Sequence, residues 1–559
     1  MRYSVRPCDP QAARDLGQSL GVAPVVAQVL LHRGYREADR AREFLNCRLS
    51  GLTAPEAMAD RALAADRLAR AVRARERIAV FGDYDVDGTT SAAILSGILE
   101  QLGGTVQVSV GNRWVGGYGL SDPALDRILS GGPTLLVTCD CGTSDHDRIE
   151  RARRAGVDVI VVDHHLVPAQ TLPALAFLNP NRAECGFAYK GLASAGLVLS
   201  LGAAVRAALN VQLDLRPWLD LVALGTIADV APLDGDNRRL VRAGLARLAA
   251  NDARPGVVAL RDLARVRGEQ VSAIDVAFRM APRLNAAGRM ADPQLTLALL
   301  RARNPSEARE AAARVEQCND DRKQTERRVT DEAIAQVLDV YGDAPRTGIV
   351  VYSEDFHRGV VGITAARLVD RFEVPAIVIA VERGLGHGSA RTHAGYPLFD
   401  AIARCADALV RFGGHNAAAG MTVETRRIDE FRGLFAMATR DVAERPGSGA
   451  PIVDATLGPD GFAVPGARDL SQLEPLGAGN IEPLFLVQQA RVAECGVVAG
   501  AHLKLELTVG RRTLRAFGYD MAPARVAVGD VIQVLGYLRP DTWSGGDRVE
   551  LRLRSFEVD

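Results

Sequence analysis

Three aspartates alternate with other residues in the short segment Asp83-Tyr84-Asp85-Val86-Asp87, which directly follows an apolar stretch. Carboxylates this close together repel one another, so a purely structural role for the trio is hard to explain without bound cations. Divalent metals that prefer oxygen ligands are the natural counter-charge. The segment therefore predicts a metal site.

Three later segments also end in acidic or histidine side chains. LLVTC is followed by Asp140, VIVV is followed by Asp163, His164 and His165, and GTIA is followed by Asp229. One aspartate at a strand end is usually a turn or capping residue, but that explanation does not extend to the whole set. Carboxylates with an added imidazole suit Mn²⁺ as well as Mg²⁺. So many ligands fit two ions better than one, and a pair of ions is typical of phosphoryl-transfer sites.

A parallel sheet would bring these side chains together. Short apolar segments at 77–82, 105–110, 134–140 and 158–163 are typical of strands, and helix-length segments separate them. That alternation predicts an α/β fold with a parallel sheet covered by helices. Ligands of such a sheet bind beyond the carboxyl ends of its strands, so the acidic segments are expected to converge on one crevice.

The chain divides into regions of different texture. Residues 304–340 contain no glycine, and no proline beyond the start, which predicts one long helix of the kind that connects two domains. The last hundred residues show short apolar segments separated by turns, which indicates a small β-barrel such as an OB fold. We expect, in chain order, a helical N-terminal arm (1–55), the parallel-sheet domain (56–303), the connecting helix (304–345), a second, smaller α/β domain (346–450) and the barrel (451–559).

Composition excludes some classes of protein and leaves others open. The net charge of -1 does not by itself indicate nucleic-acid binding. The eight cysteines lack a zinc-binding spacing, which favours reduced thiols. The N-terminus has no secretory signal, and the longest apolar run, 191–205, is too short and too rich in small residues for a membrane span. We therefore expect a cytoplasmic protein that does not contact a membrane.

The acidic segments resemble a known superfamily. DYDVDGTTS, TCDCGTSDH, VVDHH and GTIADVAPL are similar to the four motifs of the DHH phosphoesterases. The stretches VGNRWVGGYGLS, PRLNAAGRM, HRGVVGITAARL, GSAR and FGGHNAAAG are similar, in the expected order, to the RecJ family within that superfamily. The similarity extends from about residue 45 to the C-terminus. The chain departs from the pattern at Cys141, where Asn is expected, and at Ala390 and Thr392, where Gly and Ser are commoner.

The resemblance implies a function and a set of roles. It implies a single-stranded-DNA-specific 5′→3′ exonuclease of DNA repair and recombination, which releases 5′-mononucleotides with two Mn²⁺ or Mg²⁺ ions. Asp83 and Asp85 would hold one ion, Asp87, His164 and Asp229 the other, and Asp140 would bridge them. Asp163 would orient the histidines, and His165 would face the scissile phosphate. Phosphate or DNA contacts would come from Arg113, Arg283, Asn285, Arg289, Ser389, Arg391, Gly414 and His415.

The DNA path implied by the resemblance extends into the second α/β domain and the barrel. The glycine-rich segments would offer backbone N–H groups to phosphate. The barrel would hold the strand by charge and by base stacking, with Phe517, Tyr519, Tyr537 and Trp543 as candidate stackers. We expect a monomer that acts with a single-strand-binding protein and a helicase.

Two other functions stay open. The first is a DHH phosphodiesterase that acts on short oligonucleotides or cyclic dinucleotides, although the long helix and the barrel argue against it. The second is a catalytically inactive single-strand-binding relative, although such relatives lose metal-site aspartates and this chain keeps all of them.

Overall fold

The computed structural model describes residues 2–266, 270–393, 395–441, 450–541 and 548–559. The chain forms two compact units. Unit 1 consists of residues 1–281, 300–305 and 450–559, and unit 2 consists of residues 282–299 and 306–449. Trp543, one of the candidate stackers, lies outside the described residues.

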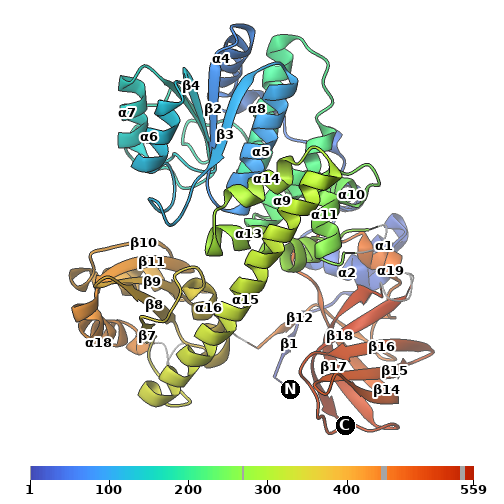
Figure 1. Ribbon diagram of the computed structural model, residues 1–559. Helices are drawn as coiled ribbons and strands as arrows, with labels where there is room; N and C mark the ends of the chain where they lie inside the picture. The colour runs from blue at the N-terminus through green and yellow to red at the C-terminus, as the bar shows by residue number, and fades with distance from the viewer. Residues whose placement is uncertain (1, 267–269, 394, 442–449, 542–547) are drawn as a thin grey trace. The chain divides into compact units, whose positions relative to one another are not determined.

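Residues 77–178 of unit 1 contain a five-stranded parallel sheet (Figure 1). Its strands are β2 (Arg77–Gly82), β3 (Thr105–Val110), β4 (Leu135–Cys139), β5 (Asp158–Val162) and β6 (Ala176–Leu178), in the order β3-β2-β4-β5-β6. The expected α/β class and its four strands are confirmed. The sequence pattern missed β6, which has only three residues.

Helices cover both faces of this sheet (Figure 1). The helices α6 (Asp122–Ser130) and α7 (His146–Arg154) share a buried core with Ala79 and Phe81 of β2 on one face. The opposite face is covered by α5 (Val86–Gln101), while α4 (Arg61–Arg73) and α8 (Ser194–Leu209) pack beside it. The apolar run at 191–205 thus belongs to a buried core helix. The chain continues through α9 (Leu219–Ala228), α10 (Gly235–Ala249), α11 (Pro255–Leu263), α12 (Ala273–Asp275) and the π-helical turn Val276–Met280.

The C-terminal residues of unit 1 form a closed five-stranded barrel. Its strands are β14 (Leu484–Val498), β15 (His502–Val509), β16 (Arg512–Gly518), β17 (Val531–Pro540) and β18 (Val549–Val558). Pairing of β14 with β17 and of β16 with β18 closes the barrel, so the expected OB-like fold is confirmed. Short β13 (Ala455–Leu457) pairs with β14, and α19 (Ala467–Ser471) lies between them in the chain.

The barrel is not an isolated module. The N-terminal helices α1 (Pro10–Leu20), α2 (Pro24–His32) and α3 (Ala38–Leu45) contribute Leu16, Val25 and Phe44, respectively, to the same buried core as the barrel residues Phe485 and Leu505. In addition, β1 (Ser4–Val5) pairs with β12 (Ile452–Val453). Removal of residues 451–559 would therefore expose an apolar core.

Unit 2 is a second, smaller α/β structure. Its sheet is mixed, in the order β10-β11-β9-β8-β7. The strands are β7 (Ile349–Ser353), β8 (Ala376–Glu382), β9 (Leu385–Arg391), β10 (Arg411–His415) and β11 (Ala418–Glu424). The helices are α13 (Ala281–Met290), α14 (Gln294–Arg301), α15 (Pro305–Tyr341), α16 (Val361–Phe372), α17 (Leu398–Ala403) and α18 (Ile428–Ala438). The predicted long helix is confirmed as α15, within one residue at each end.

The parts of the chain that the structure describes contain no helix long and apolar enough to cross a membrane.

Candidate metal centre

The alternating aspartates lie at the end of β2 and the start of α5. Asp83 follows the last residue of β2 and is buried. Asp85 caps α5, because its Oδ1 accepts the backbone N–H of Gly88 at 2.9 Å. Asp87 is buried in the first turn of α5, where the positive end of the helix dipole favours a carboxylate. The strand-to-helix turn therefore gathers all three carboxylates at the carboxyl edge of the sheet.

The N-terminus of α8 meets two of the predicted ligands. The carboxylate of Asp87 accepts the backbone N–H of Ser194 at 2.7 Å and of Ala195 at 3.0 Å. Asp140 follows β4 and accepts the hydroxyl of Ser194 at 3.0 Å. Sequence reasoning missed Ser194. The one feature of the sequence that could have indicated this contact is a serine at the start of an apolar helix, because the hydroxyl and the first backbone N–H groups of a helix are available as hydrogen-bond donors.

His164 lies between carboxylates from two other elements. Its Nε2 is 3.3 Å from Oδ1 of Asp140 and 3.7 Å from Oδ2 of Asp229, which ends α9. The ligand atoms of Asp87, His164 and Asp229 all lie within 4.8 Å of one another, as do those of Asp140, His164 and His165. The predicted ligands Asp87, Asp140, His164 and Asp229 are thus brought together, while Asp83 and Asp85 lie beside them at the end of β2.

The electrostatics of the cluster favour a bound cation. Burial, followed by the charge of neighbouring carboxylates, raises the pKa values of Asp83, Asp87 and Asp140 well above the usual range. Burial and the charge of Asp85 raise the pKa of Asp229 to about 7. These carboxylates strongly oppose one another's ionisation, as expected when cations are needed to balance their charge.

His164 supplies a second test of the metal site. Its Nε2 is buried and has no hydrogen-bond partner among the described residues. Burial, followed by the charge of His165, lowers the pKa of His164, so its imidazole is neutral and has a lone pair to donate. A buried, unpartnered imidazole nitrogen surrounded by carboxylate oxygens fits a divalent ion such as Mn²⁺ or Mg²⁺.

Asp163 orients both histidines. It follows β5, and its Oδ1 accepts the backbone N–H of His164 at 2.8 Å and contacts Nδ1 of His165 at 2.7 Å. Its Oδ2 accepts the backbone N–H of Thr143 at 3.1 Å. Burial alone would raise the pKa of Asp163, but the bonds from His165 and Thr143 lower it to about 2. Burial opposes the charge on His165, yet Asp163 raises the pKa of that imidazole to about 9.

Two polar residues around His165 were not predicted from the sequence. The hydroxyl of Tyr118 donates to the carbonyl of Asp140 at 3.1 Å and lies 3.1 Å from Nδ1 of His165. The side-chain amide of Asn179 donates to the carbonyl of His165 at 2.9 Å. Tyr118 lies in the VGNRWVGGYGLS stretch, so the motif was recognised but this residue within it was not.

The predicted phosphate contact in unit 1 is Arg113. Its guanidinium carbon lies 4.6 Å from the centre of the Tyr84 ring, and its charge opposes the rise in the pKa of Asp83. This cation therefore lies beside the acidic cluster.

Three of the predicted contacts in unit 2 share one face of its sheet. Arg391 donates to the hydroxyl of Ser389 at 3.0 Å. In the strand register, His415 pairs with Ala418 and Ala418 pairs with Arg391, so these three side chains lie in one row across β10, β11 and β9. Gly362, in the first turn of α16, approaches Ser389 and Arg391 so closely that a Cβ would lie 2.9 Å from each. A serine, an arginine and a helix N-terminus together are suited to a phosphate.

The remaining predicted contacts in unit 2 lie on α13 and in the β10–β11 hairpin. Arg283 pairs with Glu316 through contacts of 2.7 and 3.1 Å, and Arg289 donates to the carbonyl of Gly359 at 3.3 Å. Asn285 lies between these two arginines on α13. Gly414 has a φ of 140°, a backbone conformation of the β10–β11 hairpin that only glycine adopts readily.

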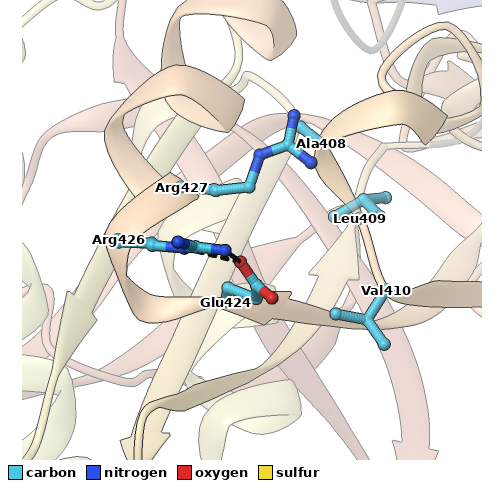
Figure 2. Close-up of a pocket in the computed structure, with 6 residues that line it drawn as sticks. All are labelled: Ala408, Leu409, Val410, Glu424, Arg426 and Arg427. Carbon is cyan, nitrogen blue, oxygen red and sulfur yellow. Dashed lines mark hydrogen bonds and ion pairs between the residues drawn. The ribbon is translucent and has the colours of Figure 1, made fainter.

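A hollow of about 580 Å³ in unit 2 contains none of the predicted site residues (Figure 2). It is lined by Ala408, Leu409, Val410, Glu424, Arg426 and Arg427. Arg426 pairs with Glu424 at 2.8 Å, and Arg427 pairs with Glu430 at 2.8 Å. Because these charges are already matched, the hollow has no clear preference for a ligand.

Comparison with known proteins gives consistent matches. Residues 77–226 match the DHH family N-terminal domain, residues 346–440 the DHHA1 domain and residues 453–555 the RecJ OB domain. The chain is 32% identical to the single-stranded-DNA-specific exonuclease RecJ of Bacillus subtilis, over 100% of this chain and 71% of the relative. It is 36% identical to that of Escherichia coli, over 84% of this chain and 85% of the relative. The crystal structure of RecJ from Thermus thermophilus with Mn²⁺ superposes with a TM-score of 0.81 at 29% identity, over 100% of this chain and 79% of that chain.

Proposed function

Because the chain belongs to the RecJ family of single-stranded-DNA-specific exonucleases, we propose that it degrades single-stranded DNA from the 5′ end and releases 5′-mononucleotides. The observation that carries this proposal is the cluster of buried Asp87 and Asp140 with half-buried His164 and Asp229 at the carboxyl edge of the parallel sheet. The family's role in DNA repair and recombination fits an enzyme of this specificity.

The residues of the cluster would share the work in hydrolysis. Asp87, His164 and Asp229 would hold one divalent ion, Asp83 and Asp85 the other, and Asp140 would bridge the two. When bound, the two ions would activate water and offset the negative charge that develops on the scissile phosphate. Asp163 holds the His165 imidazole in place and raises its pKa to about 9, so a protonated His165 would place a positive charge against the phosphate. Ser194 and Ala195 fix the orientation of the ligands Asp140 and Asp87.

The polarity of degradation would come from unit 2. Ser389, Arg391 and the N-terminus of α16 lie close together and would bind a terminal phosphate, and His415 shares their face of the sheet. Arg113, Arg283, Asn285, Arg289 and Gly414 would line the path of the strand. We propose that the chain has five functional parts, namely the N-terminal arm (1–55), the parallel-sheet domain (56–303), the connecting helix (304–345), the second α/β domain (346–450) and the barrel (451–559), which would be the single-strand-binding domain.

The setting of the enzyme is part of the same proposal. We propose that the enzyme is a monomer, and the cytoplasm is favoured because all eight cysteines are free thiols. A single-strand-binding protein and a helicase would present its substrate. A phosphodiesterase for short oligonucleotides or dinucleotides is less favoured, because such a substrate gives no role to the OB barrel.

Substrates with different ends test the polarity. The purified chain with Mn²⁺ is incubated with duplexes that carry a 5′ overhang, a 3′ overhang or blunt ends. We expect degradation from 5′ overhangs, because the relatives of this chain are specific for single-stranded DNA and the proposed terminal phosphate is the one at the 5′ end. Degradation that begins on 3′ overhangs would refute the proposed direction.

A further inference from the structure

Val230, which directly follows the candidate ligand Asp229, has an unusual backbone conformation. Its φ is 62°, in the left-handed region. Eleven described residues other than glycine have a positive φ, and Val230 is the only β-branched residue among them. A β-branched residue with this conformation is an outlier, because its Cβ substituents crowd the backbone.

The path of the chain determines this conformation. At the end of α9 the backbone N–H of Val230 bonds to the carbonyl of Ile227, and that of Ala231 bonds to Thr226, which is the helix ending that normally uses glycine. Two residues later, the backbone N–H of Leu233 bonds to the carbonyl of Ala478 at 2.7 Å. The turn is therefore held on both sides, and glycine would adopt it without strain.

Packing does not offset this strain. The side chain of Val230 is 70% exposed, so little apolar surface is buried to stabilise the fold. Within the chain alone, valine is thus a poor choice at this position. Strained residues with this character occur preferentially at sites that bind ligands, where the side chain is used.

The position of Val230 suggests what the side chain meets. Consecutive Cα atoms are about 3.8 Å apart, so Val230 lies at the rim of the cluster that contains Asp229 and His164. Leu166, two residues beyond His164 in the chain, is another exposed aliphatic side chain, at 85%. In a nucleic acid whose phosphate lies on the metal ligands, the nearest apolar surface is the sugar bonded to that phosphate.

We propose that Val230 packs against the deoxyribose bonded to the scissile phosphate and so positions the strand on the metal ligands. This inference rests on the proposed nuclease function. The strained valine is kept because the bound strand, and not the folded chain, buries its side chain.

The variant V230G tests the proposal, with E373G as its control. Glu373 ends α16 in the same left-handed conformation, with φ 55°, and its side chain is also exposed, but it lies in unit 2 and outside the candidate site. Both variants replace a strained residue by glycine. For each full-length variant with Mn²⁺, the melting temperature, kcat and KM on single-stranded DNA, and Mn²⁺ affinity are measured.

We expect V230G to melt no lower than the parent, to bind Mn²⁺ equally well and to lose about tenfold in kcat/KM, mainly through KM. E373G should keep the parent's kcat/KM. The loss in V230G should persist when the nucleotide at the cleaved end lacks its base, because the contact is with the sugar.

Three results would overturn the assignment. They are an unchanged kcat/KM in V230G, a marked fall in its melting temperature or Mn²⁺ affinity, and a loss that disappears on the abasic strand. A parent chain that is inactive on single strands would instead refute the proposed function, so the two failures are distinguishable.

Discussion

Replacement of Asp140 by asparagine separates the stability of the protein from its function. Asp140 is buried, and its pKa is raised by burial and then by the charges of Asp85, Asp87, Asp163 and Asp229. Asparagine has the same shape, tolerates the positive φ of 64° at this position and can still accept the hydroxyl of a neighbouring serine. The substitution thus removes one buried negative charge and little else.

The expected effect of Asp140→Asn on the melting temperature, relative to the parent, has opposite signs with and without metal. Without metal, Asp140→Asn should raise the melting temperature, because one of several mutually repelling carboxylates is gone. With Mn²⁺ at about one hundred times its Kd, the parent should gain about 2.7 kcal/mol. In a unit this large, that gain corresponds to a rise of about 3–5 °C. The variant should gain little, because Asp140 is proposed to bridge the two ions, so its loss weakens the binding of both.

The assay is a thermal melt of each protein in EDTA and in a Mn²⁺ series, followed by an activity measurement on single-stranded DNA. Activity of the variant should fall by about a hundredfold or more, because loss of a ligand costs at least as much as loss of its hydrogen-bond partner. A variant that melts lower than the parent in EDTA, or that responds to Mn²⁺ as the parent does, would refute the reasoning.

Three further predictions concern other parts of the chain. Arg391→Ala should raise KM at least about tenfold for a 5′-phosphorylated strand but not for a 5′-hydroxyl strand, since one charged hydrogen bond is lost; equal effects on both strands would contradict the phosphate pocket. The exposed ring of Tyr519 lies 4.7 Å from the guanidinium carbon of Arg552 and should stack a base. Tyr519→Ala should therefore weaken the binding of long strands about tenfold and leave the slope of log binding constant against log salt concentration unchanged. Arg552→Ala should reduce that slope by about 0.7. Burial raises the pKa of Glu474 from 4.5 to about 7, so its contribution to stability is complete below pH 4.5 and is lost as the pH rises through 7. Glu474→Gln should therefore melt above the parent at pH 8 and equal to it at pH 4.5, and parallel melting curves for the two proteins across this range would contradict the assignment.

Local sequence patterns predicted those elements whose environment is uniform along their length. The strands β2, β4 and β5 are buried between helices, so each appears in the sequence as a short, continuous apolar segment, whereas the edge strand β3 alternates apolar and polar residues. The helix α15 was predicted within one residue at each end, because its sequence contains neither glycine nor an internal proline, the residues that most often end a helix. The aspartates that follow β2, β4 and β5 converge because parallel strands share one carboxyl edge.

Contacts between distant segments could not be predicted in this way. The hydrogen bonds from the N-terminus of α8 to Asp87 join residues 107 and 108 positions apart, and no local pattern encodes them. The core that the N-terminal helices share with the barrel joins the two ends of the chain. The expectation that glycine-rich segments offer their amides to phosphate does not hold for β9, since this strand pairs with β8 and β11 on both sides.

Product analysis on a single strand labelled at its 5′ end tests the central claim most directly. The intact chain is incubated with this strand in Mn²⁺ or in EDTA, and the labelled product is identified at the earliest time points. The account predicts that the label is released first as a 5′-mononucleotide in Mn²⁺ and stays on the full-length strand in EDTA. Release in EDTA, or a label that stays on a progressively shorter strand, would contradict it.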